Sequence, residues 1–246
     1  MSELKDRLIR SEMVLGKAAL EKLSKKSVII FGVGGVGSWC AESLIRTGLM
    51  NLTIVDGDTV QDSNVNRQLM ATTKTIGMSK TDALRERLKD ICPEARVTAL
   101  FRRLTQDNID DFRLQDYDCV VDAIDSVSDK AALILRAREL GIPIFSSMGA
   151  ARRSDPTQIR VSDFSKVQGD GLAQALRKRF KRLDRWPGKF LCVHSLEIPL
   201  PLTDGQDSGN EGGAVTRGAG GSILSVTGCF GFFLGSLVIK EITTKD

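Results

Sequence analysis

The stretch Ser27–Phe31 (SVIIF), followed by residues 32–37 (GVGGVG), decides the fold of this chain. The first five residues are apolar and mostly β-branched, as in a buried strand, and a helical pattern then runs to Thr47, where Gly48 ends it. A strand, a glycine turn and a helix in this order are typical of a nucleotide-binding unit, because glycines let backbone amides approach phosphate oxygens. The alternative is a turn that serves packing alone. The glycines that we expect at a phosphate are Gly32, Gly34, Gly35 and Gly37.

Strands and helices alternate on either side of this unit. The pattern predicts strands at residues 51–55, 96–101, 117–121 and 143–147, and helices at residues 79–91, 107–114 and 128–140. This alternation predicts an α/β fold with a doubly wound, mostly parallel, Rossmann-like sheet. After residue 149 the pattern changes to strands at 158–164 and 190–196 around a basic helical stretch. We therefore expect a nucleotide-binding part over residues 1–149 and a smaller C-terminal α+β extension over 150–246, as a second lobe of one continuous structural domain.

Composition excludes several classes of protein. The chain has 246 residues, of which 41% are hydrophobic and 27% charged, so disorder, collagen and coiled coil do not fit. The five cysteines form no CxxC pair, which argues against a disulfide framework and a structural zinc. Reduced thiols and an N-terminus without a signal peptide favour a cytoplasmic protein. Residues 222–239 carry no charge and include Gly231 and Gly235 in GxxxG spacing; we expect a buried terminal helix, in a subunit interface, and not a membrane span.

The next strand supplies an acidic residue. Asp56 lies nineteen positions after the last glycine of the turn, where a carboxylate accepts hydrogen bonds from ribose hydroxyls in nucleotide-binding proteins. Asp58 follows in the segment VDGD. We interpret both as nucleotide-binding residues, with a simple strand end as the alternative.

The loop after this strand distinguishes an ATP-binding site from a dinucleotide-binding site. Residues 62–68 (DSNVNRQ) are dense in polar side chains, of which Asn64, Asn66, Arg67 and Gln68 are candidates for nucleotide binding. A nicotinamide enzyme has no general need for this cluster, whereas attack on an α-phosphate needs donors as charge moves onto pyrophosphate. Arg67 is the candidate for that role, and a solvated loop is the alternative.

Lys80 follows Ser79 at a predicted helix start, SKTD, which has the pattern of a capping box. A cation in the first turn opposes the helix dipole, and a bound phosphate would remove that penalty.

Two carboxylates follow the strand predicted at 117–121. Asp122 and Asp125 lie at the carboxyl end of that strand, the edge at which open α/β sheets bind ligands. Asp125 is a candidate for holding Mg²⁺ on a triphosphate, with a helix cap as the alternative.

These motifs together carry a resemblance. The glycine turn, VDGD, SNVNRQ, the Lys80 region and DAIDS occur in the order found in the adenylate-forming superfamily that includes ubiquitin-activating enzymes and activators of bacterial sulfur carriers. The segments RTGLMNLTIVD, DPTQIRVSDFSK and KFLCVHS resemble one branch, the tRNA threonylcarbamoyladenosine dehydratases. With them the resemblance extends over nearly the whole chain.

The resemblance implies an activity and a set of partners. A carboxylate on a modified adenosine beside the anticodon of tRNA is adenylated by ATP with Mg²⁺, and its carbamoyl group then closes the ring and expels AMP. It also implies a homodimer in which an N-terminal arginine reaches the partner's triphosphate; Arg7 matches the dehydratases and Arg10 the sulfur-carrier activators. The alternatives are adenylation of a ubiquitin-like sulfur carrier, which the missing zinc cysteines disfavour, and an NAD-binding redox enzyme. Whether a sulfur-handling protein binds is left open.

The C-terminal extension contributes a basic stretch with Trp186 beside it. Phosphate-backbone contacts and base stacking would suit these residues in tRNA binding, and a solvated helix face is the alternative. Cys192 and His194 alternate on the strand that follows, where His194 is a candidate base. Residues 202–221 hold seven glycines and predict a mobile or binding loop. The candidate RNA-binding residues are Arg177, Lys178, Arg179, Lys181, Arg182, Arg185 and Lys189.

Overall fold

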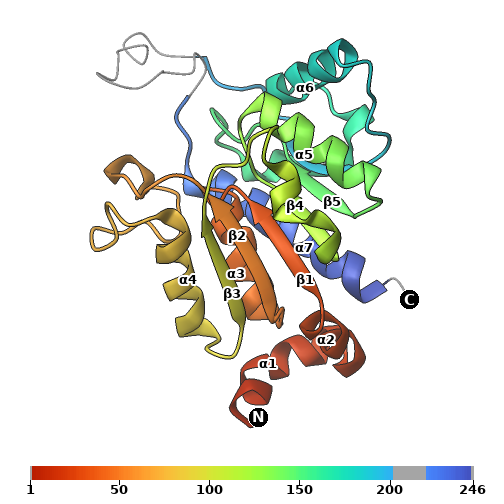
Figure 1. Ribbon diagram of the computed structural model, residues 1–246. Helices are drawn as coiled ribbons and strands as arrows, with labels where there is room; N and C mark the ends of the chain where they lie inside the picture. The colour runs from red at the N-terminus through yellow and green to blue at the C-terminus, as the bar shows by residue number, and fades with distance from the viewer. Residues whose placement is uncertain (1, 202–219, 245–246) are drawn as a thin grey trace.

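A seven-stranded sheet forms the centre of the molecule (Figure 1). The computed structural model describes residues 2–201 and 220–244. The strand order is β3-β2-β1-β4-β5-β7-β6, and every neighbouring pair is parallel except β6 and β7. The predicted doubly wound, mostly parallel sheet is therefore confirmed. The strands are β1 Ser27–Phe31, β2 Asn51–Asp56, β3 Arg96–Phe101, β4 Cys119–Asp122, β5 Ile144–Ser147, β6 Ile159–Asp163 and β7 Leu191–Ser195.

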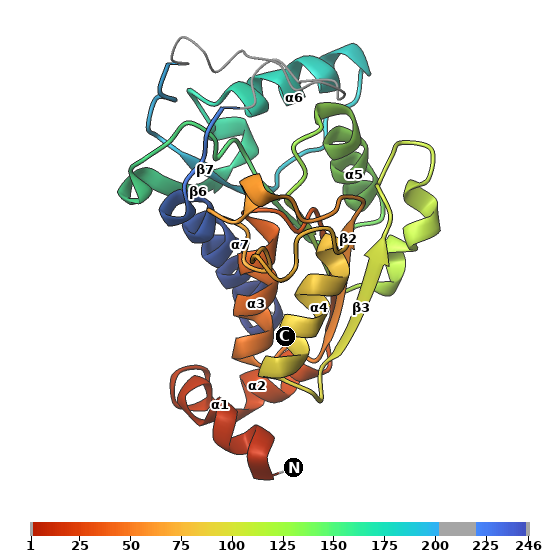
Figure 2. The ribbon, with the colours of Figure 1, turned by 90° about the vertical axis from the view of Figure 1, so that its left-hand side faces the viewer.

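Helices cover both faces of the sheet. One face carries α3 (Gly37–Thr47), α4 (Lys80–Ile91) and α7 (Leu224–Thr244), which lie side by side in Figure 2. The other face carries α5 (Val127–Glu139) and α6 (Gly171–Arg182). The first two helices, α1 (Ser2–Leu15) and α2 (Lys17–Ser24), lie below the amino ends of the strands (Figure 1). Within the described residues, the connections contain five 3₁₀ turns: η1 Asp62–Asn64, η2 Ile109–Phe112, η3 Leu114–Asp116, η4 Pro156–Gln158 and η5 Phe164–Lys166.

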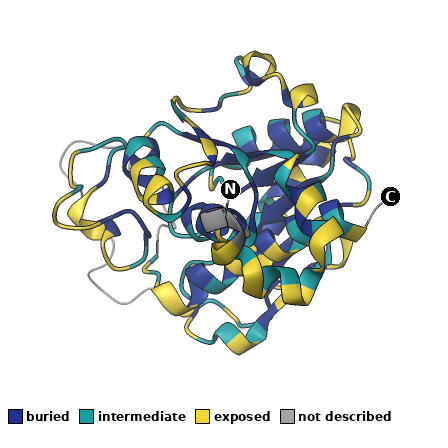
Figure 3. Ribbon diagram, turned by 90° about the horizontal axis from the view of Figure 1, so that it is seen from below, coloured by how far each residue is buried: buried dark blue, intermediate teal, exposed yellow. Residues whose placement is uncertain are grey.

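The central strands are apolar on both sides because each side is covered by helices. In β1, Val28 and Ile30 pack in the cluster shared with α3, α4 and α7, while Ile29 and Phe31 pack in the cluster shared with α5 and α6. Buried residues accordingly occupy the centre of the molecule when it is seen from the α1 end (Figure 3). A continuous apolar strand is what a parallel sheet between two helical layers requires.

Helix α7 packs its glycines against α3. A Cβ atom at Gly231 would lie 2.5 Å from the carbonyl oxygen of Val36, and one at Gly235 would lie 2.1 Å from the Oγ of Ser43. The GxxxG spacing thus serves close helix packing within the chain, as we expected of a buried terminal helix. In the described part of the chain α7 is the one helix long and apolar enough to cross a membrane, and 50% of its apolar window is buried inside the molecule.

Three local predictions differ from the structure. The helix predicted at 107–114 is wrong: the chain forms two 3₁₀ turns there because Arg113 adopts a left-handed conformation with φ of 48°. The basic helix ends at Arg182, since Asp184 is also left-handed, so residues 183–189 continue as a loop. The strands predicted beyond residue 149 do not stand apart but extend the same sheet, β7 beside β5 and β6 at the edge. Most of the loop predicted at 202–221 lies outside the described residues.

Candidate nucleotide site

A cavity of about 510 Å³ opens at the carboxyl edge of the sheet. Its walls come from the glycine turn after β1, the segment after β2, the 3₁₀ turn η1 with its following residues, and the loop after β4. These segments are far apart in the chain and meet because the parallel strands all end at this edge. Ten of the predicted residues line the cavity: Gly32, Gly34, Gly35, Asp56, Asp58, Asn64, Arg67, Gln68, Lys80 and Asp125.

The four glycines of the turn divide into two kinds. Gly32 has φ of +81°, and a Cβ atom there would lie 2.7 Å from the carbonyl oxygen of Ala123. A Cβ atom at Gly37 would lie 1.9 Å from the carbonyl oxygen of Gly32, and Gly37 does not line the cavity. Gly34 and Gly35 line the cavity just before α3, whose N-terminus no side chain caps. Packing thus explains Gly37, whereas Gly34 and Gly35 leave room for an anion at a helix N-terminus.

Asp56 anchors the glycine turn to the end of β2. Its two carboxylate oxygens accept hydrogen bonds from the backbone N–H groups of Val33 (2.8 Å) and Asp58 (3.0 Å). Each oxygen retains a free lone pair, so the carboxylate can also accept two hydroxyl groups from a ligand.

Lys80 is held at the cavity by a carboxylate. Its Nζ lies 2.9 Å from an oxygen of Asp58, and its side chain is 9% exposed. Arg103 binds the other oxygen of Asp58 at 3.0 Å. Burial opposes ionisation of Asp58, but the hydrogen bonds and charges of Lys80 and Arg103 outweigh it and lower the pKa of this carboxyl. One half of the predicted capping box forms, since Ser79 Oγ accepts from the N–H of Asp82 at 3.1 Å and Lys80 begins α4.

Arg67 reaches the cavity from the residues after η1. Its guanidinium donates to the carbonyl of Ser63 and to Asn66 Oδ1, both at 2.9 Å. The amide of Asn66 in turn donates to the carbonyl of Ser222, at 2.8 Å, in the segment before α7. Burial lowers the pKa of the Arg67 guanidinium, because the charge loses hydration that an anion in the cavity would replace.

The neighbouring polar residues have different surroundings. Asn64 is buried and its Oδ1 accepts from the N–H of Gln61 at 3.1 Å, so this side chain caps η1. Gln68 is buried in the cavity wall, and its Oε1 has no hydrogen-bond partner among the described residues. Asn66 does not line the cavity. Of the two asparagines predicted to bind nucleotide, Asn66 contacts Arg67 and the backbone instead.

The two aspartates after β4 are not equivalent. Asp122 is fully buried, pairs with Lys130 at 2.8 Å and does not line the cavity, so its prediction as a nucleotide ligand is not supported by its position. Asp125 is exposed, lines the cavity and makes no hydrogen bond or ion pair within the described residues. The N-cap of α5 is Ser126, not Asp125. The carboxylate of Asp125 is therefore free to bind a ligand.

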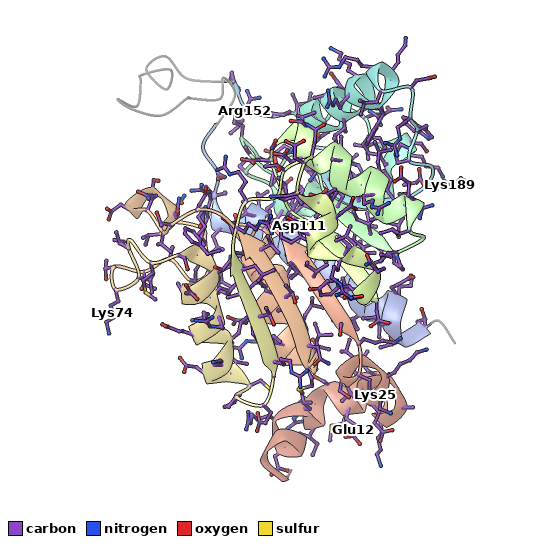
Figure 4. All side chains as sticks on the ribbon, viewed as in Figure 1. Glu12, Lys25, Lys74, Asp111, Arg152 and Lys189 are labelled. Carbon is purple, nitrogen blue, oxygen red and sulfur yellow. The ribbon has the colours of Figure 1, made fainter. Side chains whose placement is uncertain are left out.

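The N-terminal arginines lie far from this cavity. The guanidinium of Arg7 binds both oxygens of Glu94, at 2.9 and 3.1 Å, just before the start of β3 and so at the amino edge of the sheet. Arg10 is exposed on the same helix. In Figure 4, Glu12 and Lys25 mark this end of the molecule, opposite Arg152.

Three of the seven predicted RNA-binding cations are used inside the protein. Arg177 donates to the carbonyls of Phe164 (2.8 Å) and Val167 (2.5 Å). Arg179 donates to Gln106 at 2.9 Å, and Arg185 pairs with Glu139. The others are exposed: Lys178, Lys181, Arg182 and Lys189.

Cys192 and His194 lie inside the sheet, away from the cavity. Cys192 is fully buried, and burial raises the pKa of its thiol to about 12. His194 is 2% exposed, its Nε2 lies 2.9 Å from Ser162 Oγ, and burial lowers its pKa. A buried thiol and a buried neutral imidazole both fit packing roles.

Several parts of the cavity wall were not predicted as nucleotide-binding, and two of them contribute polar side chains from outside the predicted motifs. Arg102 and Arg103 follow β3 at the carboxyl edge, where the position of that predicted strand could have indicated them. Ser222 and Thr227 come from the segment leading into α7, and no motif in the sequence marks them. The backbone holds that segment in place, since the N–H of Arg152 donates to the carbonyl of Gly221 at 2.8 Å.

A mostly parallel sheet with a glycine turn, a carboxylate after the second strand and a polar loop at one cavity defines the class of nucleotide-binding proteins with a Rossmann-like fold. The model of the ThiF family matches residues 6–243, and the chain belongs to that family. The tRNA threonylcarbamoyladenosine dehydratase of Escherichia coli (strain K12) is 37% identical over 244 residues, which cover 94% of this chain and 91% of that protein.

Solved structures agree with this relationship. The crystal structure of the E. coli tRNA N6-threonylcarbamoyladenosine dehydratase in complex with ATP has a TM-score of 0.87 and 34% identity, covering 98% of this chain and 96% of that one. Its complex with AMP has a TM-score of 0.88 and 35% identity over the same shares. The family resemblance predicted from the motifs is confirmed.

Proposed function

We propose that this enzyme catalyses the ATP-dependent cyclising dehydration of N6-threonylcarbamoyladenosine next to the anticodon of tRNA. The observation that carries the proposal is a cavity with the adenylation residues in a chain similar, over almost its whole length, to a dehydratase of that name whose structure holds ATP or AMP. Cytoplasmic tRNA and the five free cysteines suit a cytoplasmic enzyme.

The proposed chemistry has two steps. A carboxylate oxygen of the substrate forms a bond to the α-phosphorus of ATP, and the bond from that phosphorus to the bridging oxygen breaks, releasing pyrophosphate. The carbamoyl group then attacks the activated carbonyl, loses a proton and expels AMP. Oxygen leaves on AMP, so water is lost only formally. Because the second nucleophile is already attached to the substrate, ring closure has a high effective molarity and requires no thioester on the enzyme.

The cavity residues suit distinct parts of ATP. The two free lone pairs of Asp56 suit the ribose hydroxyls, and the N–H groups at Gly34 and Gly35 suit phosphate oxygens. Arg67 and Lys80 supply positive charge where pyrophosphate departs. In this assignment, Lys80 and Arg67 keep Asp58 and Asn66 as partners, and phosphate oxygens accept from the remaining donors of the two cations.

Mg²⁺ fits the residues at Asp125. Magnesium is usually held by one or two carboxylates together with substrate phosphates, and Asp125 is an unpaired carboxylate beside the cavity. No group of three or more His, Cys, Asp or Glu that could hold a metal occurs within residues 2–201 and 220–244. Bound with ATP, the ion would neutralise triphosphate charge; the protein's part is to place the Asp125 carboxylate.

We also propose that the enzyme works as a homodimer. Apolar side chains are exposed on α1 (Met13 68%, Val14 82%) and on α7 (Phe232 49%, Phe233 39%), which suits burial in a subunit interface. Arg10 is the favoured arginine for the partner's site, because Glu94 already occupies the guanidinium of Arg7.

Mixed dimers test this assembly. Arg10→Ala and Arg67→Ala protomers, each inactive alone, should recover one intact site and part of the activity when they are combined. Arg7→Ala is the matched variant and should complement in the same way only if Arg7 is the residue that crosses. Light scattering that shows only monomer at micromolar concentration would overturn the dimer.

For tRNA we propose the exposed face of α6 and the loop after it. Lys178, Lys181 and Arg182 are exposed and unpaired among the described residues, so phosphates could contact them without breaking internal bonds. Trp186, 55% exposed, packs with ring-centroid distances of 5.9 Å from Phe164 and 6.1 Å from Phe180, which holds it ready for stacking on a base.

Mass spectrometry of digested tRNA tests the activity directly. Incubation with ATP and Mg²⁺ should convert threonylcarbamoyladenosine to a product lighter by one water, with one pyrophosphate and one AMP released per product. Omitting ATP or supplying NAD should leave the nucleoside unchanged. Pyrophosphate release that requires a protein carrier tail instead of tRNA would contradict the proposal.

A further inference from the structure

A fully buried ion pair lies beneath the loop that carries Asp125. Lys130 on α5 and Asp122 at the end of β4 are both 0% exposed, and their charged atoms are 2.8 Å apart. Asp122 also accepts a hydrogen bond from Ser146 Oγ at 2.6 Å. Neither charged residue lines the cavity, so the pair is not a direct contact for a ligand.

The pair holds one peptide unit of the loop from both sides. The N–H of Ile124 donates to Asp122 at 3.1 Å, and the carbonyl of Ile124 accepts from Lys130 Nζ at 2.8 Å. The next residue is Asp125. The preceding residue, Ala123, donates its N–H to the carbonyl of Phe31 at 2.8 Å, and its carbonyl lies against Gly32. The backbone that leads to Asp125 is thus held in two places. The charged pair holds it at Ile124, and contacts with Phe31 and Gly32 hold it at Ala123.

Stability alone is a weak explanation for such a pair. Burying two charges removes their hydration, and apolar residues of similar size often stabilise a core as well or better. The rest of β4 is apolar and buried, so the site would accept such residues. An apolar pair cannot supply an acceptor for the N–H of Ile124 or a donor for its carbonyl.

We propose that Lys130 and Asp122 are positioning residues that set the direction of the Asp125 carboxylate toward a metal-bound nucleotide. This inference rests on the proposed function, because it needs Asp125 to hold the metal. Asp122 thus acts on the nucleotide site through the loop and not by direct contact. Lys130 shares this positioning role, which no sequence motif indicated.

Metal binding with a nonhydrolysable nucleotide tests the proposal without tRNA or turnover. Mn²⁺ would be titrated by electron paramagnetic resonance into protein saturated with a methylene analogue of ATP. The double variant Lys130→Met with Asp122→Asn keeps the site neutral and keeps an acceptor for the N–H of Ile124, but removes the donor to its carbonyl. We expect its Mn²⁺ Kd to rise about 10- to 100-fold, as when residues behind metal ligands are changed. Binding of the analogue without metal should change by less than about two-fold.

Ser146→Ala is the matched control. It removes a hydrogen bond to the Asp122 oxygen that Lys130 also contacts, but it removes no hydrogen bond to the loop. The Mn²⁺ Kd of this variant should therefore stay within about two-fold of the wild-type value. If the double variant fails to fold in a thermal melt, Lys130→Arg replaces it; this change keeps the charge but moves the donors, and should also weaken Mn²⁺ binding.

The outcomes separate this inference from the proposed function. An unchanged Mn²⁺ Kd in a folded variant overturns the positioning role and leaves the proposed function standing. A Kd that weakens equally in Ser146→Ala also overturns it, because the loop contacts are then irrelevant. Wild-type protein that is saturated with the analogue but binds no Mn²⁺ overturns both the metal role of Asp125 and the inference.

Discussion

The cavity and helix α6 both present cations, but they hold them in different ways. In the cavity, Lys80 is 9% exposed and lies 2.9 Å from Asp58, and Arg67 is held by Ser63 and Asn66. On α6, the side chains of Lys178 and Lys181 are exposed and make no hydrogen bond or ion pair among the described residues. Cavity cations are fixed before any ligand arrives, whereas those on α6 are free to move.

The difference matches two kinds of ligand. A transition state gains most from donors whose positions are set in advance, since no reorganisation is needed as charge develops. A phosphate backbone is bound by counterion release, which depends on charge and requires little fixed geometry. The contrast also shows that a run of basic residues overstates a binding surface, because Arg177, Arg179 and Arg185 are bonded within the protein.

The largest effect is expected at Arg67. Arg67→Ala should reduce pyrophosphate release by about 10²- to 10³-fold, because a fixed donor for the transition state is lost. The free energy of unfolding should change by less than about 1 kcal/mol, since the side chain is half-buried in a loop. Pyrophosphate assays and thermal melts measure the two quantities. Arg67→Lys keeps the charge but loses the planar guanidinium donors, so its rate of pyrophosphate release should lie between those of wild type and Arg67→Ala. A fully active Arg67→Ala would show that Arg67 has no part in the mechanism.

A smaller loss is expected at Asp125. Asp125→Asn keeps the shape but not the charge, and activity at low Mg²⁺ should drop by at least about 10-fold, with partial recovery at high Mg²⁺. The measurement is the rate as a function of Mg²⁺ concentration. Ser126→Ala is the control, because Ser126 occupies the N-cap position of α5 without a side-chain capping bond. Normal turnover of Asp125→Asn at low Mg²⁺ would show that Asp125 has no role in holding the metal.

On α6 the effect should appear in tRNA binding and not in ATP binding. Replacing Lys178, Lys181 and Arg182 by Ala should lower the slope of log Kd against log salt by about 2 to 3 for three lost phosphate contacts. ATP affinity should not change, because none of the three lines the cavity.

The control for α6 is a triple variant with the same change in charge elsewhere. Lys17 and Lys22 lie on α2 and Lys25 is its C-cap, at the end of the molecule away from Lys189 (Figure 4). Their replacement by Ala should leave the salt slope of tRNA binding unchanged. Equal salt slopes in both triple variants would show that the α6 face is an ordinary solvated surface with no specific role in tRNA binding.

The smallest effect concerns Asp58, the carboxylate that pairs with Lys80 and Arg103. The pKa of Asp58 is lowered in the folded protein, so its contribution to stability is present above the unfolded value of about 3.9 and is lost as pH falls below it. Because the side chain is 48% exposed, we expect at most about 1 kcal/mol, or about 2–4 °C in Tm. Melting curves from pH 7 to pH 3 should show a smaller fall for Asp58→Asn than for wild type.

Lys178→Gln is the control for that titration. Without a carboxylate partner among the described residues, its loss should leave the pH profile of Tm unchanged. Identical profiles for wild type and Asp58→Asn would show that solvent screens the pair and that Lys80 is not fixed by it.

Local signals predicted much of the fold because short-range physics controls them. The stop at Gly48 predicted the end of α3 to the residue, and Ser79 predicted the start of α4. The helix expected at 107–114 failed because apolar spacing does not report the left-handed backbone at Arg113. The place of β6 and β7 in the sheet could not be predicted, since strand neighbours depend on contacts between distant segments.

The site divides in the same way. Asp56, Arg67, Lys80 and Asp125 carry chemistry that their motifs indicate, and they line the cavity. Asp122 looks equivalent to Asp125 in the segment DAID, yet one points into the core and the other to solvent. Only the packing of α5 against β4, which brings Lys130 to Asp122, separates the two carboxylates.

By itself the sequence determined the βα units, the order of the nucleotide motifs and the family, because strand, turn and cap preferences act over a few residues. The tertiary structure alone decided which charges remain free. A charged side chain that is satisfied by the protein has fewer groups left to offer a ligand, and the partner that satisfies it can come from far along the chain, as Glu94 does for Arg7 and Glu139 for Arg185.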